Sequence, residues 1–280
     1  MDERTEEQTT QAPPWTRYVA VGDSFTEGME DVGEDGAYRG WADRLAHQLA
    51  GGRAAADPTG GAIEPLRYAN LAVRGRLLGQ IVQEQVPAAI ELGADLVSLV
   101  GGGNDVLRPG SDPDRLAARL EAAVVDLRVS GADVLLATPV DPVQSPLINL
   151  TRGKAAVFAA AIWTIARRHQ TYVLDLWGMK ALQDRRLWAP DRIHLTSEGH
   201  QRVALHAAEV LGLAGDGSWA IPLPPAQARD RRTALREDAQ WLRQYVGPWV
   251  GRRLRRQSSG DTVQPKRPTA EPLPLVDRDS

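Results

Sequence analysis

Short apolar stretches alternate along the chain with longer stretches in which apolar and polar residues recur at helical spacing. Runs of four or five residues rich in Val and Leu are typical of strands buried on both faces of a sheet. Five strands are predicted, at Tyr18–Val21, Leu66–Asn70, Leu96–Val100, Val134–Ala137 and Tyr172–Leu176. Five helices are predicted at Tyr38–Ala50, Leu77–Leu92, Pro113–Ser130, Lys154–Gln170 and Thr196–Leu211. This alternation indicates a parallel sheet with helices on both faces, a three-layer α/β/α sandwich.

The pattern changes at both ends of the chain. Residues 1–16 are polar and charged and contain consecutive prolines, so a disordered segment is predicted there. Residues 17–212 are predicted to form the α/β domain. A linker and a basic helical extension are predicted at 213–256, and a proline-rich, disordered tail at 257–280.

Composition excludes several classes of protein. The net charge of −3 indicates no general attraction to nucleic acid or to an anionic membrane. The absence of cysteine excludes disulfides, thiolate metal sites and cysteine nucleophiles. The acidic, polar N-terminus does not fit a signal peptide, and no apolar run approaches the roughly 18 residues of a transmembrane helix. A cytoplasmic location is therefore predicted.

The extension is locally basic, with nine arginines against three acidic residues between Arg229 and Arg256. One interpretation is a solvated helix that docks on the domain through Trp241 and Tyr245. The other is a binding surface for an acidic partner, an anionic lipid or nucleic acid, in which Trp249 also takes part. The sequence does not separate these interpretations, and no specific nucleic-acid site is predicted.

Small and polar residues follow the predicted strands, at the edge of a parallel sheet where ligands bind. The first strand ends in GDS, which includes Ser24. The second continues into NLAVRG, which ends at Gly75, and the third into GGGND, which includes Asn104. DRIH follows the fifth strand and places Asp191 three residues before His194.

These residue types match the needs of serine-dependent ester hydrolysis. A serine hydroxyl must lose its proton as it attacks, and a histidine oriented by a carboxylate can accept that proton. Ser24, His194 and Asp191 can fill these roles. N–H donors must also meet the developing oxyanion, each worth about 10²–10³ in kcat. The main-chain N–H groups of Ser24 and Gly75 and the side-chain amide of Asn104 can supply them.

The blocks GDSFTEG, NLAVRG, GGND and DRIH resemble, in this order, those of the GDSL or SGNH hydrolase family over about residues 17–211. The resemblance implies a flavodoxin-like α/β/α fold and an esterase or lipase that needs no cofactor and no metal. By position, it implies a nucleophile at Ser24, a catalytic Asp191 and His194, and oxyanion donors at Gly75 and Asn104. No GxSxG motif is present, which disfavours an ordinary α/β-hydrolase.

Two positions depart from the family's usual residues. Phe25 follows the serine where Leu is usual, which concerns packing more than chemistry. Arg74 precedes the second-block glycine where many members carry a small residue, and this affects the expected shape and charge of the pocket. Asp23 is expected only to order its turn, and His200 is assigned a surface or packing role.

Each block also has a structural interpretation when it is taken alone. Ser24 could be a loop serine or a helix cap, and Asp191 with His194 could cap the following helix. The same pair could begin a metal site, although no acidic or histidine partner occurs at a supporting spacing. The four blocks together favour catalysis.

The sequence thus predicts hydrolysis of carboxylic esters through an acyl-enzyme. The segment Thr138–Gly153 is expected to border the pocket, with Val143, Leu147 and Ile148 as an apolar wall. A short acyl ester, a lysophospholipid and an acetylated sugar all remain open as substrates. The alternative is an interaction or scaffold protein that uses the basic extension and retains only residual catalysis.

Overall fold

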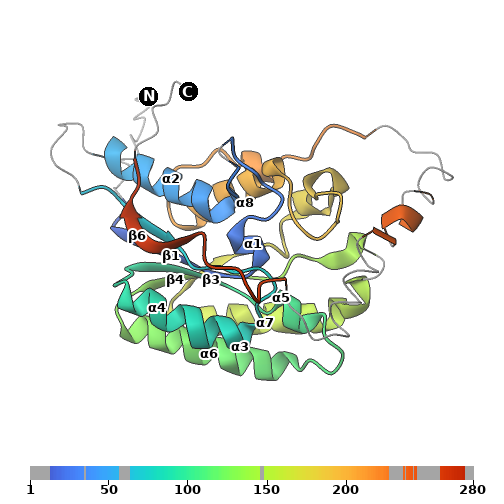
Figure 1. Ribbon diagram of the computed structural model, residues 1–280, viewed down its shortest axis with the longest axis horizontal. Coiled ribbons are helices and arrows are strands. Elements are labelled where there is room, and N and C mark those ends of the chain that lie inside the picture. The colour runs from blue at the N-terminus through green and yellow to red at the C-terminus, as the bar shows by residue number, and fades with distance from the viewer. Residues whose placement is uncertain are drawn as a thin grey trace, which may run out of the picture.

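A six-stranded sheet runs through the middle of the molecule in the computed structural model, with helices on both faces (Figure 1). The residues that the structure describes are 13–34, 36–56, 64–145, 148–226, 236, 238–241, 243–244 and 259–274. The strands are β1 (Arg17–Gly22), β2 (Arg67–Asn70), β3 (Leu96–Val100), β4 (Asp133–Ala137), β5 (Tyr172–Leu174) and β6 (Arg267–Pro272).

The strand order across the sheet is β5-β4-β3-β1-β2-β6, and β1 to β5 are parallel. Without β6 this is the flavodoxin-like order, in which the direction of winding reverses between β1 and β3. Connections leave these two neighbouring strands toward opposite faces, so a crevice opens at their carboxyl ends. The predicted fold class is confirmed, and the crevice is where Ser24 and Asn104 follow their strands.

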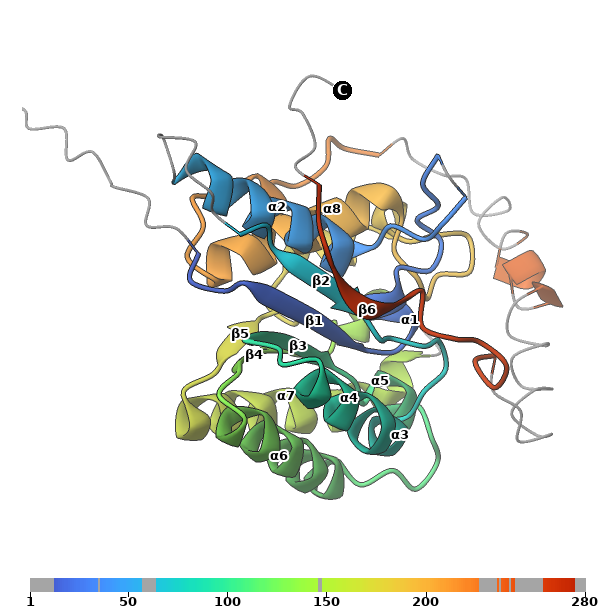
Figure 2. The same ribbon diagram turned by 60° about the vertical axis from the view of Figure 1, so that its left-hand side comes forward.

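Helices cover both faces of the sheet (Figure 2). The longer helices are α2 (Trp41–Ala55), α6 (Pro113–Val129), α7 (Arg152–His169) and α8 (Ser197–Val210). The shorter ones are α1 (Ser24–Glu27), α3 (Leu78–Gln80), α4 (Val86–Glu91) and α5 (Gly103–Val106). Helices α2 and α8 pack on one face, and α3, α4, α6 and α7 on the other. Within the described residues, no helix is both long and apolar enough to cross a membrane.

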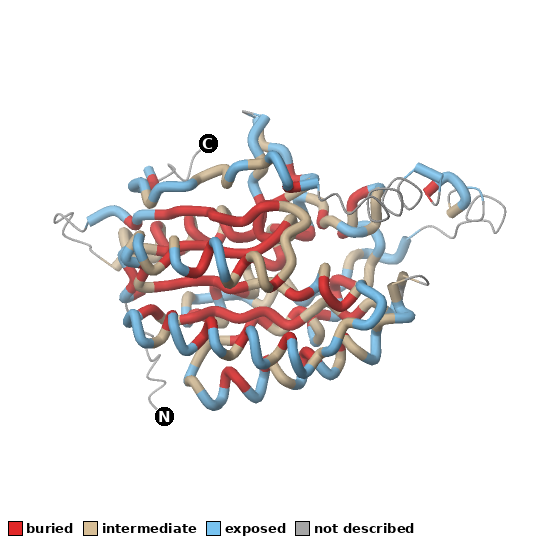
Figure 3. The backbone as a smooth tube through the Cα atoms, turned by 60° about the horizontal axis from the view of Figure 1, so that its bottom comes forward, coloured by how far each residue is buried: buried red, intermediate tan, exposed pale blue. Residues whose placement is uncertain are grey.

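Buried residues run through the middle of the molecule (Figure 3), and in the central strand β1 every residue after Arg17 is buried. Tyr18 and Ala20 pack in the apolar layer under α2 and α8, whereas Val19 and Val21 pack in the layer on the opposite face. Successive side chains of a strand point to opposite faces, so an unbroken apolar run fits a strand with a core on each side. This packing fixes the position of the chain as it enters Ser24.

The helix predicted at Leu77–Leu92 is divided into three parts. A π-helical segment, Ile81–Gln85, separates α3 from α4. Pro87 lies in the first turn of α4 and has no N–H to donate to a preceding carbonyl, which favours a local change in the helical hydrogen bonding. The wider turn places the Gln85 side chain against the end of β1.

Strand β6 corrects the prediction of a disordered tail at 257–280, because 259–274 are ordered. β6 pairs antiparallel with β2, and Leu273 is buried in the core under α2 and α8. The Lys266 ammonium donates to Glu27 O, Tyr38 O and the Asp43 carboxylate. Prolines are tolerated on an edge strand, so the proline-rich composition did not prevent pairing. Residues 257–258 and 275–280 lie outside the described residues.

The predicted disorder of residues 1–16 is likewise wrong for its last four residues. Trp15 is buried, and its indole donates to Asp133 Oδ2 at 2.9 Å. The Thr16 N–H and hydroxyl both donate to Asp95 Oδ2. An aromatic side chain with a buried N–H partner is enough to order the short approach to β1. Residues 1–12 lie outside the described residues.

Candidate active site

Three of the predicted residues form a continuous hydrogen-bonded chain at the carboxyl edge of the sheet. His194 Nδ1 lies 2.5 Å from Asp191 Oδ2, and His194 Nε2 lies 3.0 Å from Ser24 Oγ. With Asp191 ionised, Nδ1 carries the proton and donates it to the carboxylate, which leaves Nε2 as the acceptor for the serine hydroxyl. The Asp191 and His194 side chains are only 13% and 14% exposed. The arrangement can therefore remove a proton from Ser24.

The Asp191 carboxylate also stabilises the loop that carries Asp191 and His194. Asp191 Oδ1 accepts from the N–H groups of Ile193 and His194, at 3.0 and 3.1 Å. Burial alone raises the pKa of Asp191, but the hydrogen bond and charge of His194 and these two N–H donors outweigh it. The pKa of Asp191 therefore lies below its ordinary value. Asp191 stays ionised at neutral pH, as the orientation of the imidazole requires.

Ser24 is the first residue of α1, directly after the turn that ends β1. Asp23 caps this helix by accepting from the Phe25 N–H. The buried Gln85 amide holds the other side of the turn, because it accepts from the Gly22 N–H at 2.7 Å and donates to Gly22 O at 3.0 Å. Sequence reasoning missed Gln85, since only the proline two residues later hinted at a change in the helix.

Close backbone packing fixes the far end of α1. Gly28 ends this helix in the left-handed region, at φ +89°, and a Cβ built there would lie 2.4 Å from Gly40 N. A Cβ on Gly40 would in turn lie 2.4 Å from Gly28 Cα. Gly28, the second glycine of the block GDSFTEG, thus lets α1 lie against the start of α2.

Asn104 lies in α5 after β3, beside the turn that contains Asp23 and Ser24. Its side-chain nitrogen donates to Asp23 Oδ2 at 3.0 Å and to Arg76 O at 3.1 Å. Gly75, directly before Arg76, adopts a left-handed conformation at φ +74°. Ser24 and Asn104 both line the pocket described below, whereas Gly75 does not. Asn104 therefore ties the loops after β1, β2 and β3 together.

Asp23 is more than a turn residue. Burial raises its pKa to about 6, although the Phe25 N–H and the positive charge that His194 can carry both act to lower it. Its carboxylate is an acceptor for the Asn104 amide. The predicted role of ordering the turn is confirmed by the hydrogen bond to Phe25, and the contact with Asn104 is additional.

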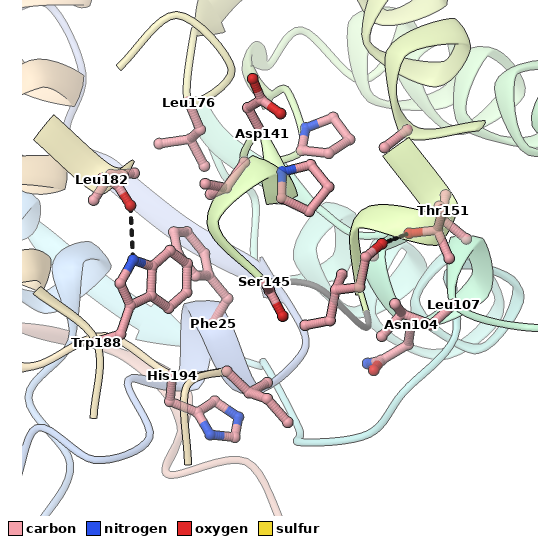
Figure 4. Close-up of a pocket in the computed structure, with 18 of the residues that line it drawn as sticks. Phe25, Asn104, Leu107, Asp141, Ser145, Thr151, Leu176, Leu182, Trp188 and His194 are labelled. Carbon is pink, nitrogen blue, oxygen red and sulfur yellow. Dashed lines mark hydrogen bonds between the residues drawn. The ribbon is translucent and has the colours of Figure 1, made fainter. Parts of the chain in front are cut away.

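A cavity of about 260 Å³ opens beside Ser24 and His194 (Figure 4). Most of its wall is apolar, as in many small-molecule sites. Apolar side chains in this wall include Phe25, Val100, Leu107, Ile148, Leu176, Leu182, Trp188 and Trp241. Residues between Thr138 and Thr151 form one side, as the sequence predicts. Of the three wall residues named from the sequence, Ile148 lines the cavity, Val143 does not, and Leu147 lies outside the described residues.

The two arginines that line the cavity share one carboxylate. Arg192 donates to Asp238 at 2.7 Å, and Arg185 lies 3.6 Å from the same carboxylate. Arg74, whose charge was expected to affect the pocket, instead pairs with the buried Glu27 and lies outside the cavity wall. These pairs leave the apolar surface as the dominant feature of the cavity.

The remaining predicted features have structural explanations. His200 is fully buried under α2, where Nδ1 accepts from the Trp41 N–H at 3.2 Å, so its packing assignment is confirmed. Across the described ranges, no group of three or more metal-ligating side chains is close enough to hold an ion. Trp241 docks on the domain as expected, but Tyr245 and Trp249 lie outside the described residues.

Comparison with known proteins identifies the family. The GDSL-like lipase/acylhydrolase family profile matches residues 20–202, more than half of the chain. The chain therefore belongs to the GDSL-like lipase/acylhydrolase family, and it is a hydrolase that acts on ester bonds in small molecules. No curated protein matches the chain.

Solved structures share the fold. LAE5, an alpha/beta hydrolase enzyme from the metagenome of Lake Arreo in Spain, is 22% identical with a TM-score of 0.57, over 70% of this chain and 95% of its own. A catalytic mutant of Axe2, an acetylxylan esterase from Geobacillus stearothermophilus, is 19% identical with a TM-score of 0.57, over 74% and 97%. TesA is 22% identical with a TM-score of 0.53, over 70% and 97%.

Proposed function

We propose that Ser24, His194 and Asp191 hydrolyse carboxylic esters through an acyl-enzyme. The observation that supports this most directly is the chain of hydrogen bonds from Asp191 Oδ2 through the imidazole to Ser24 Oγ, at 2.5 and 3.0 Å. The histidine and the serine lie within the reach expected of a general base and its nucleophile. Asp191 orients the ring and stabilises the imidazolium that forms.

In the first half of the reaction, Ser24 Oγ attacks the acyl carbonyl while His194 Nε2 takes the hydroxyl proton. The tetrahedral intermediate collapses, the C–O bond to the alcohol breaks, and His194 returns the proton to the leaving oxygen. In the second half, water attacks the acyl-enzyme and gives one proton to His194. The Ser24–acyl bond then breaks, Ser24 regains its proton, and the carboxylic acid leaves.

The oxyanion donors in this proposal are the N–H groups of Ser24 and Gly75 and the side-chain amide of Asn104. Ser24 and Asn104 line the cavity, whereas Gly75 does not and is assigned by its position in the second sequence block. Both N–H groups of Asn104 already have acceptors, Asp23 Oδ2 and Arg76 O. A developing oxyanion therefore competes with one of these acceptors as its negative charge grows. The Asn104 amide must therefore share or give up one of these hydrogen bonds as it meets the oxyanion.

The cavity supports a neutral ester with an acyl chain longer than acetyl as the substrate. Its wall is mainly aliphatic and aromatic, and burial of each methylene contributes about 0.8 kcal/mol. An anionic headgroup would need a cation in the wall, and the two arginines there, Arg185 and Arg192, share the Asp238 carboxylate, which partly neutralises their charge. Among the three candidates from the sequence, the acyl ester is therefore preferred over a lysophospholipid and an acetylated sugar.

The experiment is hydrolysis of p-nitrophenyl esters from acetate to decanoate by wild type and Ser24→Ala. Loss of the nucleophile should lower kcat by at least about 10³-fold. Wild type should show a higher kcat/KM for butyrate or longer chains than for acetate.

Ser130→Ala is a matched control. Ser130 is the C-terminal cap of α6 and lies outside the cavity wall, and its hydroxyl donates to Leu127 O. This variant should retain wild-type rates. Equal rates for wild type and Ser24→Ala would contradict the nucleophile assignment. A preference for acetate would contradict the assigned acyl chain but leave the mechanism intact.

A further inference from the structure

A short piece of the C-terminal extension lies against the loop that carries Asp191 and His194. The Trp241 indole N–H donates to the main-chain oxygen of Asp191 at 2.7 Å. Trp241 is 8% exposed, although it follows Asp191 by 50 residues and lies beyond the family match that ends at residue 202. A buried indole that donates to a single main-chain oxygen is a specific contact, because its N–H has few alternative partners.

A second set of contacts joins the same two segments. The Arg192 guanidinium lies over the Trp241 ring, 4.9 Å from the centroid, and donates to Asp238 at 2.7 Å. Arg192 also has φ +60°, a conformation that is unfavourable for a residue with a side chain. Trp241 and Asp238 thus hold the side chain of Arg192, the residue with the unfavourable positive φ in the turn between Asp191 and His194.

Trp241 also lines the cavity beside Ser24 and His194. Its ring is therefore a part of the apolar wall, while its indole nitrogen holds the backbone of the residue that orients His194. One side chain connects the fit of the acyl chain with the position of Asp191.

We propose that Trp241 is a positioning and specificity-determining residue for ester hydrolysis, an inference that rests on the proposed function of Ser24, His194 and Asp191. Its indole N–H keeps the Asp191 backbone in place, and its ring closes one side of the acyl site. These two effects are separable, because phenylalanine retains most of the ring surface but has no N–H to donate.

The test compares Trp241→Phe and Trp241→Ala in the full chain, with the same series of p-nitrophenyl esters. Trp241→Phe should lower kcat about five- to tenfold for every chain length with little change in KM, the size expected for one lost hydrogen bond. Trp241→Ala should lower kcat similarly and also raise KM about tenfold for octanoate while leaving KM for acetate unchanged. Asp238→Asn should lower kcat by a smaller factor, because it weakens only the support of Arg192.

Trp219→Phe is the matched control, since the Trp219 indole also donates to one acceptor, Glu209, but outside the cavity. Its kinetics should equal those of wild type. Wild-type kcat and an unchanged chain-length profile in both Trp241 variants would overturn the inference and leave the proposed function standing. Equal rates for wild type and Ser24→Ala would overturn the proposed function, and the inference with it. If Trp241→Ala does not fold, the kcat of Trp241→Phe and Asp238→Asn still decides.

Discussion

At the scale of single residues, the site depends on side chains that hold one another as much as on the reacting groups. Asn104 illustrates this, because its amide joins Asp23 after β1 to Arg76 after β2 and also lines the cavity with Ser24. A neutral amide supports an anionic intermediate without the cost of burying a second charge.

We expect Asn104→Ala to lower kcat about 10²–10³-fold with a small change in KM, because an oxyanion donor acts mainly in the transition state. Steady-state kinetics with a butyrate ester measures this. Asn149→Ala is the control, since Asn149 is exposed and lies outside the cavity wall. A loss that appears only in KM would contradict the role of Asn104 as a donor.

The protonation of the buried His200 makes the stability of the fold depend on pH. His200 Nδ1 accepts a hydrogen bond from the Trp41 N–H. A proton on Nδ1 would remove this acceptor and place two N–H donors against each other. Burial lowers the pKa of His200 to about 4; the negative charge of Asp31 and the Met29 carbonyl raise it in part, and Arg44 lowers it further. The unfolded chain binds a proton at His200 below about pH 6.5, whereas the folded chain does not until about pH 4, so this residue destabilises the fold as pH falls.

We therefore expect the stability difference between wild type and His200→Gln to change with pH. Wild type should lose about 3 kcal/mol relative to the variant between pH 7 and pH 4, as follows from a shift of this size. Urea unfolding at pH 4, 5, 6 and 7 measures it. Only the difference is informative, because Asp23, with a raised pKa, contributes the opposite slope between about pH 4 and 6 in both proteins. A constant difference would contradict the neutral, buried histidine.

At the scale of elements, the contact between α1 and α2 determines how Ser24 is presented. Gly28 and Gly40 touch through their backbones, and a side chain on either would require the two helices to separate. Gly51 lies in the middle of α2 but has open space where a Cβ would stand. Close packing therefore requires a glycine at position 40 but not at position 51.

Gly40→Ala should lower the free energy of unfolding by about 1–3 kcal/mol, because the added methyl overlaps the Gly28 backbone. Gly51→Ala should raise it by roughly 0.5–1 kcal/mol, since alanine is favoured over glycine inside a helix. Thermal or urea unfolding of both variants checks the pair. An unchanged or raised free energy of unfolding in Gly40→Ala would show that the close packing of α1 on α2 is not what makes Gly40 necessary.

Local patterns predicted most elements because each carries its own signal. The apolar run of β1 and the helix predicted at Pro113–Ser130 are examples, and both occur where expected. The π-helical segment before Pro87 was missed, because helical periodicity alone does not reveal a local change in hydrogen bonding. The strand β6 was missed because its pairing depends on the free edge of β2, which lies about 200 residues away in sequence.

At the scale of the whole molecule, the C-terminal part of the chain returns twice to the domain. Strand β6 and Lys266 cover the edge near α1 and α2, and Trp241 covers the catalytic loop. The proximity of Ser24, Asn104, Asp191 and His194 was predictable because strand ends meet at one edge of a parallel sheet. The cavity wall and the contact of Trp241 were not, because they depend on how distant loops meet.

Lys266→Ala should lower the free energy of unfolding by about 2 kcal/mol, since Glu27 O, Tyr38 O and the Asp43 carboxylate lose their charged donor. Lys154→Ala is the control, because Lys154 makes one hydrogen bond, to Ser111, and should change stability by less than about 0.5 kcal/mol. Urea unfolding at neutral pH compares the two. Equal effects would mean that the returning tail does not stabilise the domain.

Covalent labelling tests most directly whether Ser24 is the nucleophile. A fluorophosphonate should react with the folded wild-type protein at one serine, which peptide mass spectrometry should locate at Ser24, and Ser24→Ala and His194→Ala should remain unlabelled. An interaction protein that uses its basic extension would need no such reactive serine. Failure of the folded wild type to react, or a label on another serine, would contradict the account.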